Sequence, residues 1–122
     1  MRTTLYIIDE YEKVRSALAE RLSQSKSLSV LGHGADCEMV MQEIDRLRPD
    51  IILIEIKRKD GMGLELTRQI ASLPEAPRLI VLTSYQKIWE QQAAARAGAG
   101  TYLLKELNSE ELIREIETLA AV

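Results

Sequence analysis

Short apolar runs and longer amphipathic segments alternate five times along the chain. The apolar runs indicate strands, and the segments with an apolar residue at every third or fourth position indicate helices. We expect strands at 5–8, 28–31, 51–55, 79–83 and 101–104, followed in turn by helices at 14–22, 40–47, 66–73, 86–97 and 108–119. Strands that alternate with helices predict a parallel sheet covered on both faces, which is a three-layer α/β/α sandwich.

Residues with special backbone preferences mark several ends of these segments. Pro49 disfavours helical geometry in the residue before it, so the second helix should stop there. Gly98 can adopt the left-handed conformation that ends a helix, and Asn108 and Glu111 have the spacing of a capping box. These signals support the boundaries that the apolar pattern predicts.

Length and composition narrow the class of protein. With 122 residues, of which 46% are apolar and 29% charged, the chain should form a single globular domain over residues 1–122. A net charge of −3 argues against a nucleic-acid surface on this chain. One cysteine and one histidine cannot complete a closed zinc site. No segment approaches the ~20 apolar residues of a membrane span, so we predict a cytoplasmic protein.

Polar side chains follow the predicted strands at the edge of the sheet where ligands bind. In parallel α/β sheets this edge lies at the carboxyl ends of the strands. Three acids, two hydroxyls and one amine are expected there: Asp9, Glu10, Glu55, Thr83, Ser84 and Lys105. Clustered carboxylates suit a hard divalent cation, of which Mg²⁺ is the common choice. A hydroxyl and an ammonium beside the cation suit a phosphoryl group.

Several segments resemble the receiver domain of bacterial two-component response regulators. They are YIIDE at the first strand end, RPDIILIEI into the third strand, IVLTSY at the fourth, and AAARAGAGTYLLKE from Ala93 to Glu106. The resemblance covers essentially the whole chain and implies a flavodoxin-like fold with a five-stranded parallel sheet of order 2-1-3-4-5 and five helices. It also implies a signalling module and not an enzyme.

The resemblance assigns roles to residues at matching positions. In similar domains an acidic pair after the first strand and the acceptor carboxylate hold Mg²⁺, which would here be Asp9, Glu10 and Glu55. The hydroxyl and the amine that contact the phosphoryl group would be Thr83 and Lys105. The aromatic residue that changes rotamer when the domain switches would be Tyr102.

The sequence departs from the family at the phosphoacceptor. Similar domains carry aspartate where this chain has Glu55, and the loop after it reads Arg58-Lys59-Asp60 instead of a sequence such as Met-Pro-Gly. One added methylene moves the carboxylate by about 1.5 Å, and a ~1 Å misplacement at a reacting centre can cost on the order of 100-fold in rate. We therefore predict a pseudo-receiver, with Glu55 either imitating the phosphorylated state or only preserving charge.

Three consecutive bases follow the altered acceptor. Lys57, Arg58 and Lys59 could supply positive charge that Mg²⁺ would otherwise provide, so that Mg²⁺ binds weakly or not at all. The alternative is a solvated loop whose exposed ion pairs contribute ~0 to 1 kcal/mol each. Elsewhere, His33 is expected to be a strand-end or surface residue, and Cys37 a packing residue.

The expected partners are proteins: a sensor kinase, an output domain or a second copy of the chain. Trp89 lies on the fourth helix, which in receiver domains borders the surface formed with strand five and helix five, so either a homodimer contact there or ordinary packing is open. The LLKE ending resembles receivers that precede LuxR-type helix-turn-helix domains. One alternative is a phosphorylation-competent receiver of a transcriptional regulator. A flavin- or nucleotide-binding enzyme is disfavoured, because acids stand where phosphates need donors.

Overall fold

Strands and helices alternate strictly in the computed structural model, which describes residues 2–121. In chain order the elements are β1 (Thr3–Ile8), α1 (Glu12–Leu22), β2 (Leu28–Gly34), α2 (Cys37–Leu47), β3 (Ile51–Ile54), α3 (Gly63–Ala71), β4 (Arg78–Thr83), α4 (Ile88–Ala97), β5 (Thr101–Leu104) and α5 (Ser109–Ala120). The βα pattern predicted from apolar spacing is confirmed in each of its repeats.

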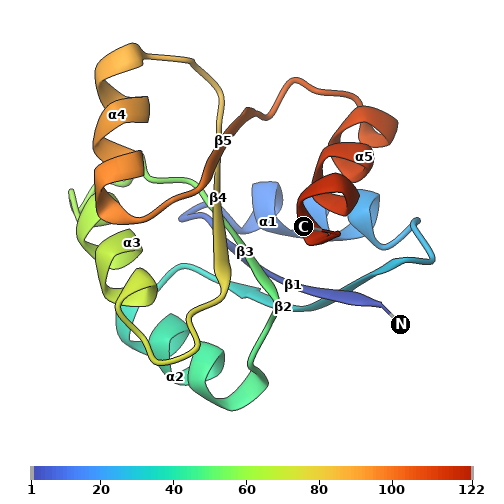
Figure 1. The fold of residues 1–122 in the computed structure, drawn as a ribbon, viewed down its shortest axis with the longest axis horizontal. Helices are drawn as coiled ribbons and strands as arrows, with labels where there is room; N and C mark the ends of the chain where they lie inside the picture. Colours follow the sequence, from blue (N-terminus) through green and yellow to red (C-terminus); the bar gives the residue numbers. More distant parts are fainter. Residues whose placement is uncertain (1, 122) are drawn as a thin grey trace.

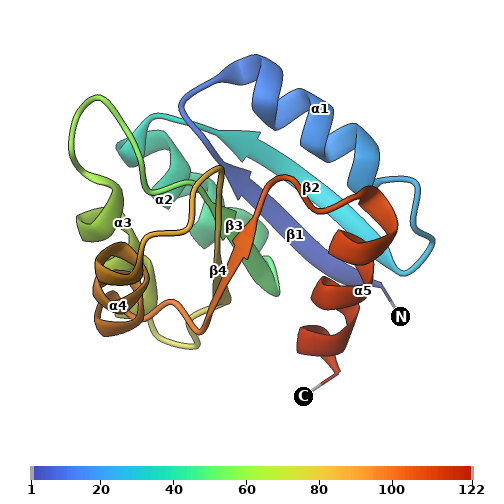
Figure 2. The same ribbon diagram turned by 90° about the horizontal axis from the view of Figure 1, so that it is seen from above.

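The strands form one parallel sheet of order β2-β1-β3-β4-β5. Helices α1 and α5 cover one face, and α2, α3 and α4 cover the other (Figures 1 and 2). Side chains alternate between the two faces along each strand, so Leu5 and Ile7 pack toward α1 and α5 whereas Tyr6 and Ile8 pack toward α2 and α3. The predicted flavodoxin-like sandwich is therefore confirmed.

The second strand is longer than its apolar run predicts. It continues through two glycines to Gly34, which pairs with Ile8 at the end of β1. A Cβ on Gly34 would lie 2.7 Å from the Tyr6 hydroxyl, and this hydroxyl donates a hydrogen bond of 2.7 Å to Glu43 on α2. The glycines thus make room for a buried tyrosine and do not end the strand.

Other boundaries differ by a few residues. Strand β3 ends at Ile54, so Glu55 is the first residue of the following loop, and α4 begins at Ile88 instead of 86. Gly98 ends α4 in the left-handed conformation as expected, with φ of 116°. Asn108 caps α5 by accepting a hydrogen bond of 2.9 Å from the backbone amide of Glu111. Among the described residues, no helix is both long and apolar enough to span a bilayer.

Candidate functional site at the carboxyl edge of the sheet

Four strand ends bring the predicted site residues to one edge of the sheet. Asp9 follows β1 and Glu55 follows β3, two adjacent strands. Thr83 is the last residue of β4, and Lys105 follows β5, where its backbone amide donates to the Thr83 carbonyl at 2.8 Å. Asp9, Glu55 and Thr83 are 2%, 7% and 0% exposed. The edge therefore holds two buried carboxylates and one buried hydroxyl.

The Lys105 ammonium bridges both buried carboxylates. Its Nζ lies 2.7 Å from Asp9 Oδ2 and 3.0 Å from Glu55 Oε1. Burial disfavours the charged ammonium, but the hydrogen bond to Asp9 and the charge of Glu55 outweigh burial, so the pKa of Lys105 is raised. The three side chains form one compact charge cluster that carries one excess negative charge when all are ionised.

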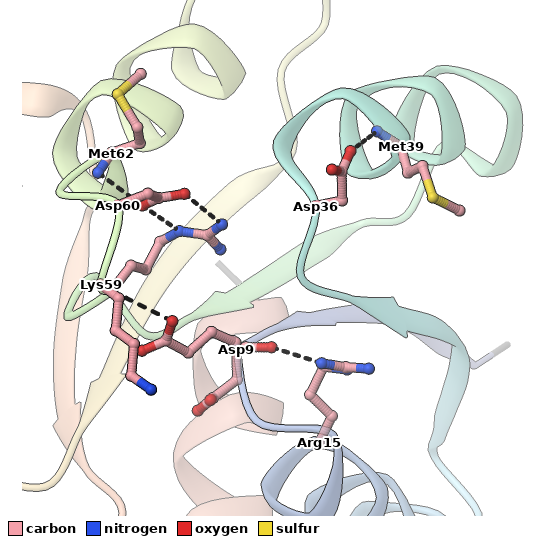
Figure 3. Close-up of polar contacts among 9 residues, drawn as sticks. Asp9, Arg15, Asp36, Met39, Lys59, Asp60 and Met62 are labelled. Atoms are coloured by element: carbon pink, nitrogen blue, oxygen red, sulfur yellow. Dashed lines mark hydrogen bonds and ion pairs between the residues drawn. The ribbon is translucent and has the colours of Figure 1, made fainter.

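Backbone amides donate to one carboxylate oxygen of each acid at the edge. Asp9 Oδ1 accepts from the amide of Tyr11 at 2.9 Å, and Glu55 Oε2 accepts from the amide of Lys57 at 3.1 Å. The side chain of Glu10 turns toward the β3–α3 loop and accepts from the amide of Lys59 at 3.2 Å (Figure 3). Each acid of the edge is thus held by a donor of the protein itself.

In this arrangement the acids do not fit a Mg²⁺ site. Among residues 2–121, no group of three or more His, Cys, Asp or Glu side chains is gathered so that it can hold a metal ion. Both oxygens of Asp9 and both oxygens of Glu55 already accept hydrogen bonds or ion pairs, and Glu10 points to the loop. A hard cation needs several carboxylate oxygens directed at one point, and here Lys105 lies between Asp9 and Glu55 while Glu10 turns away to the loop.

The three bases after Glu55 are arranged differently from the predicted charge compensation. Arg58 forks onto Asp60 in its own loop, with Nε and Nη2 at 3.1 and 3.0 Å from the two carboxylate oxygens. Lys57 Nζ lies 4.9 Å from the ring centre of Tyr85, and Lys59 Nζ lies 5.9 Å from that of Tyr11. No ion pair joins these three side chains to Asp9, Glu10 or Glu55 within the described residues, so Lys105 provides the direct pairing.

The two hydrogen bonds from Arg58 strongly affect the pKa of the Asp60 carboxylate. The hydrogen bonds from Arg58, aided by the backbone amide of Met62 at 2.9 Å, lower the pKa of Asp60 to about 2 (Figure 3). The Arg58 side chain is 5% exposed, and its Nη1 has no hydrogen-bond partner in the described part of the chain. The loop is therefore built around a buried guanidinium and is not merely a solvated charge run.

The predicted hydroxyl and aromatic residue lie beside the cluster. Thr83 Oγ1 is buried and makes no hydrogen bond within the described residues. The Tyr102 hydroxyl lies 3.2 Å from the Tyr85 carbonyl and 3.2 Å from Glu90 Oε1 on α4. The cavity among Asp9, Glu55 and Lys105 measures about 10 Å³, which is room for about one water molecule.

Sequence reasoning missed a contact between α1 and the end of β2. Arg15 Nη1 donates to the carbonyl of Asp9 at 2.9 Å (Figure 3). Arg15 Nε donates to His33 Nδ1 at 3.1 Å. His33 is a strand-end residue as predicted, but it is joined to the acidic edge through Arg15. The strand order 2-1-3 was the available signal, since it makes β2 the neighbour of β1.

Comparison with known proteins identifies the family. The sequence matches the response regulator receiver domain over residues 5–117. The chain belongs to this family. Among curated relatives, the DNA-binding transcriptional activator DevR/DosR of Mycobacterium tuberculosis is 30% identical over 117 residues, 96% of this chain and 54% of the relative. The response regulator protein VraR of Staphylococcus aureus is 30% identical over 113 residues, 92% of this chain and 54% of the relative.

Solved structures share the receiver fold. A LuxR-family two-component response regulator from Aurantimonas superposes with a TM-score of 0.89 at 24% identity, covering 99% of this chain and 86% of the other. The receiver domain of the putative response regulator NarL from Mycobacterium tuberculosis gives a TM-score of 0.88 at 20% identity, covering 98% and 97%. At these identities the likeness concerns the fold.

The comparisons fix the class of this receiver domain. It is a receiver of two-component signal transduction, and the family and the relatives named here are signalling proteins and not enzymes, as predicted. The chain spans about half the length of the curated relatives it matches. The names of these longer proteins therefore describe more than the part that matches this chain.

Proposed function

We propose that this receiver domain is a pseudo-receiver, which regulates an output domain or partner through protein contacts without conventional phosphorylation. The observation that carries the proposal is the Lys105 ammonium, 2.7 Å from Asp9 and 3.0 Å from Glu55. The residue positions that would bind the cation and accept the phosphoryl group are joined to each other by an internal ion pair. Lys105 thereby cancels one of the two negative charges of Asp9 and Glu55 without Mg²⁺.

The geometry around Glu55 opposes phosphoryl transfer. In-line attack needs a carboxylate lone pair facing the donor, and the contacts of Glu55 with Lys105 and with the Lys57 amide restrict how its carboxylate can turn. The cavity beside Asp9, Glu55 and Lys105, about 10 Å³, has room for about one water molecule. A phosphoryl group also brings about −1.5 to −2 charges into a cluster that already carries an excess negative charge.

The contacts of Glu55 correspond to a partial mimic of the phosphorylated state. Glu55 reaches Lys105, the amine assigned to phosphoryl contact, but the Thr83 hydroxyl has no hydrogen-bond partner among residues 2–121. The carboxylate therefore reproduces one of the two contacts that we assign to a phosphoryl group. We infer a fixed output state and not a complete imitation of the active one.

The test is adduct formation by the natural chain and by Glu55→Asp. Each is incubated with Mg²⁺ and acetyl phosphate and analysed by intact mass, and with beryllofluoride and analysed by NMR. We expect no adduct and no spectral change for the natural chain, and an adduct or a clear spectral change for Glu55→Asp. A phosphoryl mass on the natural chain would contradict the proposal.

The second candidate is a phosphorylation-competent receiver of a transcriptional regulator. It is favoured by the relatives, since one at 30% identity is named a DNA-binding transcriptional activator. The Thr83 hydroxyl and the Lys105 amine are both present at the edge of the sheet, as such a receiver requires. The same adduct experiment separates the two candidates, and Lys105→Met should abolish any adduct that forms.

Protein contacts are the proposed output of the domain, and the exposed large side chains at the start of α4 and in the loop before it favour this. Tyr85, Ile88 and Trp89 are 68%, 73% and 63% exposed, so the packing alternative for Trp89 is wrong. We propose that a second copy, a sensor kinase or an output domain docks on α4, β5 and α5 in the cytoplasm.

The homodimer is tested by sedimentation of the natural chain and of Trp89→Asp. The variant should raise the Kd of the dimer at least tenfold. An unchanged Kd or a monomeric natural chain would exclude this homodimer.

A further inference from the structure

Helix α4 buries a carboxylate that the candidate site does not use. Glu90 is 5% exposed, although it lies on a helix next to the exposed Ile88 and Trp89. A buried carboxylate requires a donor or an opposite charge. Within residues 2–121 Glu90 forms no ion pair, and its side chain has one hydrogen bond, from the Tyr102 hydroxyl at 3.2 Å. The burial of Glu90 therefore depends on where this hydroxyl lies.

The Tyr102 hydroxyl is held from two sides. It lies 3.2 Å from Glu90 Oε1 and also 3.2 Å from the carbonyl of Tyr85, in the loop that precedes α4. Burial and the neighbouring Glu90 charge raise the pKa of Tyr102, so the phenol remains a donor at neutral pH. A phenol has one proton for these two acceptors. A movement of the β4–α4 loop, which carries the Tyr85 carbonyl, would therefore strengthen or weaken the hydrogen bond from Tyr102 to Glu90.

The β4–α4 loop is in turn linked to the altered acceptor. The Lys57 ammonium lies 4.9 Å from the ring centre of Tyr85, within the range of a cation–π contact. The backbone amide of the same Lys57 donates to Glu55 Oε2 at 3.1 Å. One residue thus contacts the acceptor carboxylate through its main chain and the β4–α4 loop through its side chain.

We propose that Glu90 is a positioning residue that holds the Tyr102 side chain against α4, and that Lys57, Tyr85, Tyr102 and Glu90 connect Glu55 to the exposed surface around Trp89. This inference rests on the proposed function in that it describes how an unphosphorylated acceptor fixes the output surface. The connection consists of consecutive contacts between side chains and main chain, and each contact can be removed separately.

The test uses Trp89 as the reporter, because the chain has one tryptophan and hence one indole N–H resonance in an NMR spectrum. Lys57→Met removes the ammonium and keeps the length of the side chain. Lys59→Met is the matched control, since Lys59 lies in the same loop but over Tyr11. We expect Lys57→Met to shift the Trp89 indole resonance and Lys59→Met to leave it in place.

The connection is tested by repeating Lys57→Met in three backgrounds. Tyr102→Phe removes only the hydroxyl, and the shift of the Trp89 resonance should fall to that of the Lys59→Met control. Glu90→Leu should abolish the shift as well, whereas Glu90→Gln keeps an acceptor oxygen and should retain it. A full shift in Tyr102→Phe, or an equal shift from Lys59→Met, would overturn the proposal. If Glu90→Leu does not fold, Tyr102→Phe decides alone.

This experiment needs no phosphate donor, so it fails or succeeds independently of the pseudo-receiver proposal. A phosphorylated natural chain whose Trp89 resonance still responds to Lys57 through Tyr102 would refute the pseudo-receiver and keep the connection. An unreactive natural chain whose Trp89 resonance ignores Lys57→Met would keep the pseudo-receiver and refute the connection.

Discussion

Removing the Lys105 ammonium should destabilise the domain by about 3 to 5 kcal/mol at pH 7, the usual cost of breaking a buried ion pair by deleting one partner. The side chains of Asp9 and Glu55 are 3% and 8% exposed, and that of Lys105 is 22% exposed, so solvent screens these charges only weakly. In Lys105→Met two carboxylates remain buried together without a cation. We expect the variant to stay folded, since a domain of this size has ~6 to 18 kcal/mol of stability.

The pH dependence of the Lys105 contribution to stability follows from its raised pKa. Because the pKa of Lys105 is raised in the folded state, its stabilisation is fully present below the ordinary lysine pKa of ~10.4 and is lost only as pH rises through the folded value. At pH 7 the natural chain therefore has the whole contribution.

Urea unfolding at pH 7 measures this loss of stability, with Lys26→Met as an exposed lysine control. The double variant Lys105→Met with Glu55→Gln should recover at least ~1 kcal/mol relative to Lys105→Met, because one buried charge is gone. A loss below ~1 kcal/mol at pH 7, typical of a surface pair, would refute the buried bridge. So would a double variant no more stable than Lys105→Met.

Two further predictions concern the β3–α3 loop. A Cβ on Gly63 would lie 1.8 Å from the Ile56 carbonyl oxygen, so Gly63→Ala should lower the free energy of unfolding by about 3 kcal/mol or more in a thermal melt. Gly100→Ala is the control: a Cβ there would meet open space, and the free energy of unfolding should change by less than ~1 kcal/mol. In Arg58→Gln the pKa of Asp60 should rise from about 2 toward its ordinary value of 3.8, as measured by a carboxyl NMR titration. In the natural chain the Arg58–Asp60 contact should lose its contribution to stability only as pH falls from 3.8 to about 2. An unchanged pKa of Asp60 in the variant would exclude this contact.

The strands and the edge of the sheet were predictable because their signals are local. Each buried strand is a continuous apolar run, and the first polar residue after it, such as Asp9 or Glu55, marks the carboxyl end. The three-residue extension of β2 beyond its apolar run was not predicted, because its glycines accommodate Tyr6, which comes from another strand. Boundaries set by contacts between strands cannot be inferred from one segment.

The partners of the charged side chains were less predictable. The position of three bases after Glu55 left two alternatives, compensation of the acids or a solvated loop, whereas Arg58 in fact pairs with Asp60, two residues away in the same loop. The acids are instead held partly by backbone amides, such as those of Lys57 and Lys59, which every sequence possesses. Contacts of backbone amides depend on the path of the loop, so the residue types in the sequence do not predict them.

The added methylene of Glu55 has two linked consequences for the edge of the sheet. It extends the carboxylate by about 1.5 Å, which places Oε1 3.0 Å from Lys105 while Lys105 also lies 2.7 Å from Asp9. An aspartate at the same backbone position would withdraw from the ammonium and leave a gap beside it. The ion pair with Lys105 and the small size of the cavity therefore both depend on this methylene. Glu55→Asp should enlarge the cavity and, at the same time, free carboxylate oxygens for a divalent cation. Mg²⁺ affinity that rises in Glu55→Asp is the expected sign of this linkage, and an affinity equal to that of the natural chain would separate the two consequences.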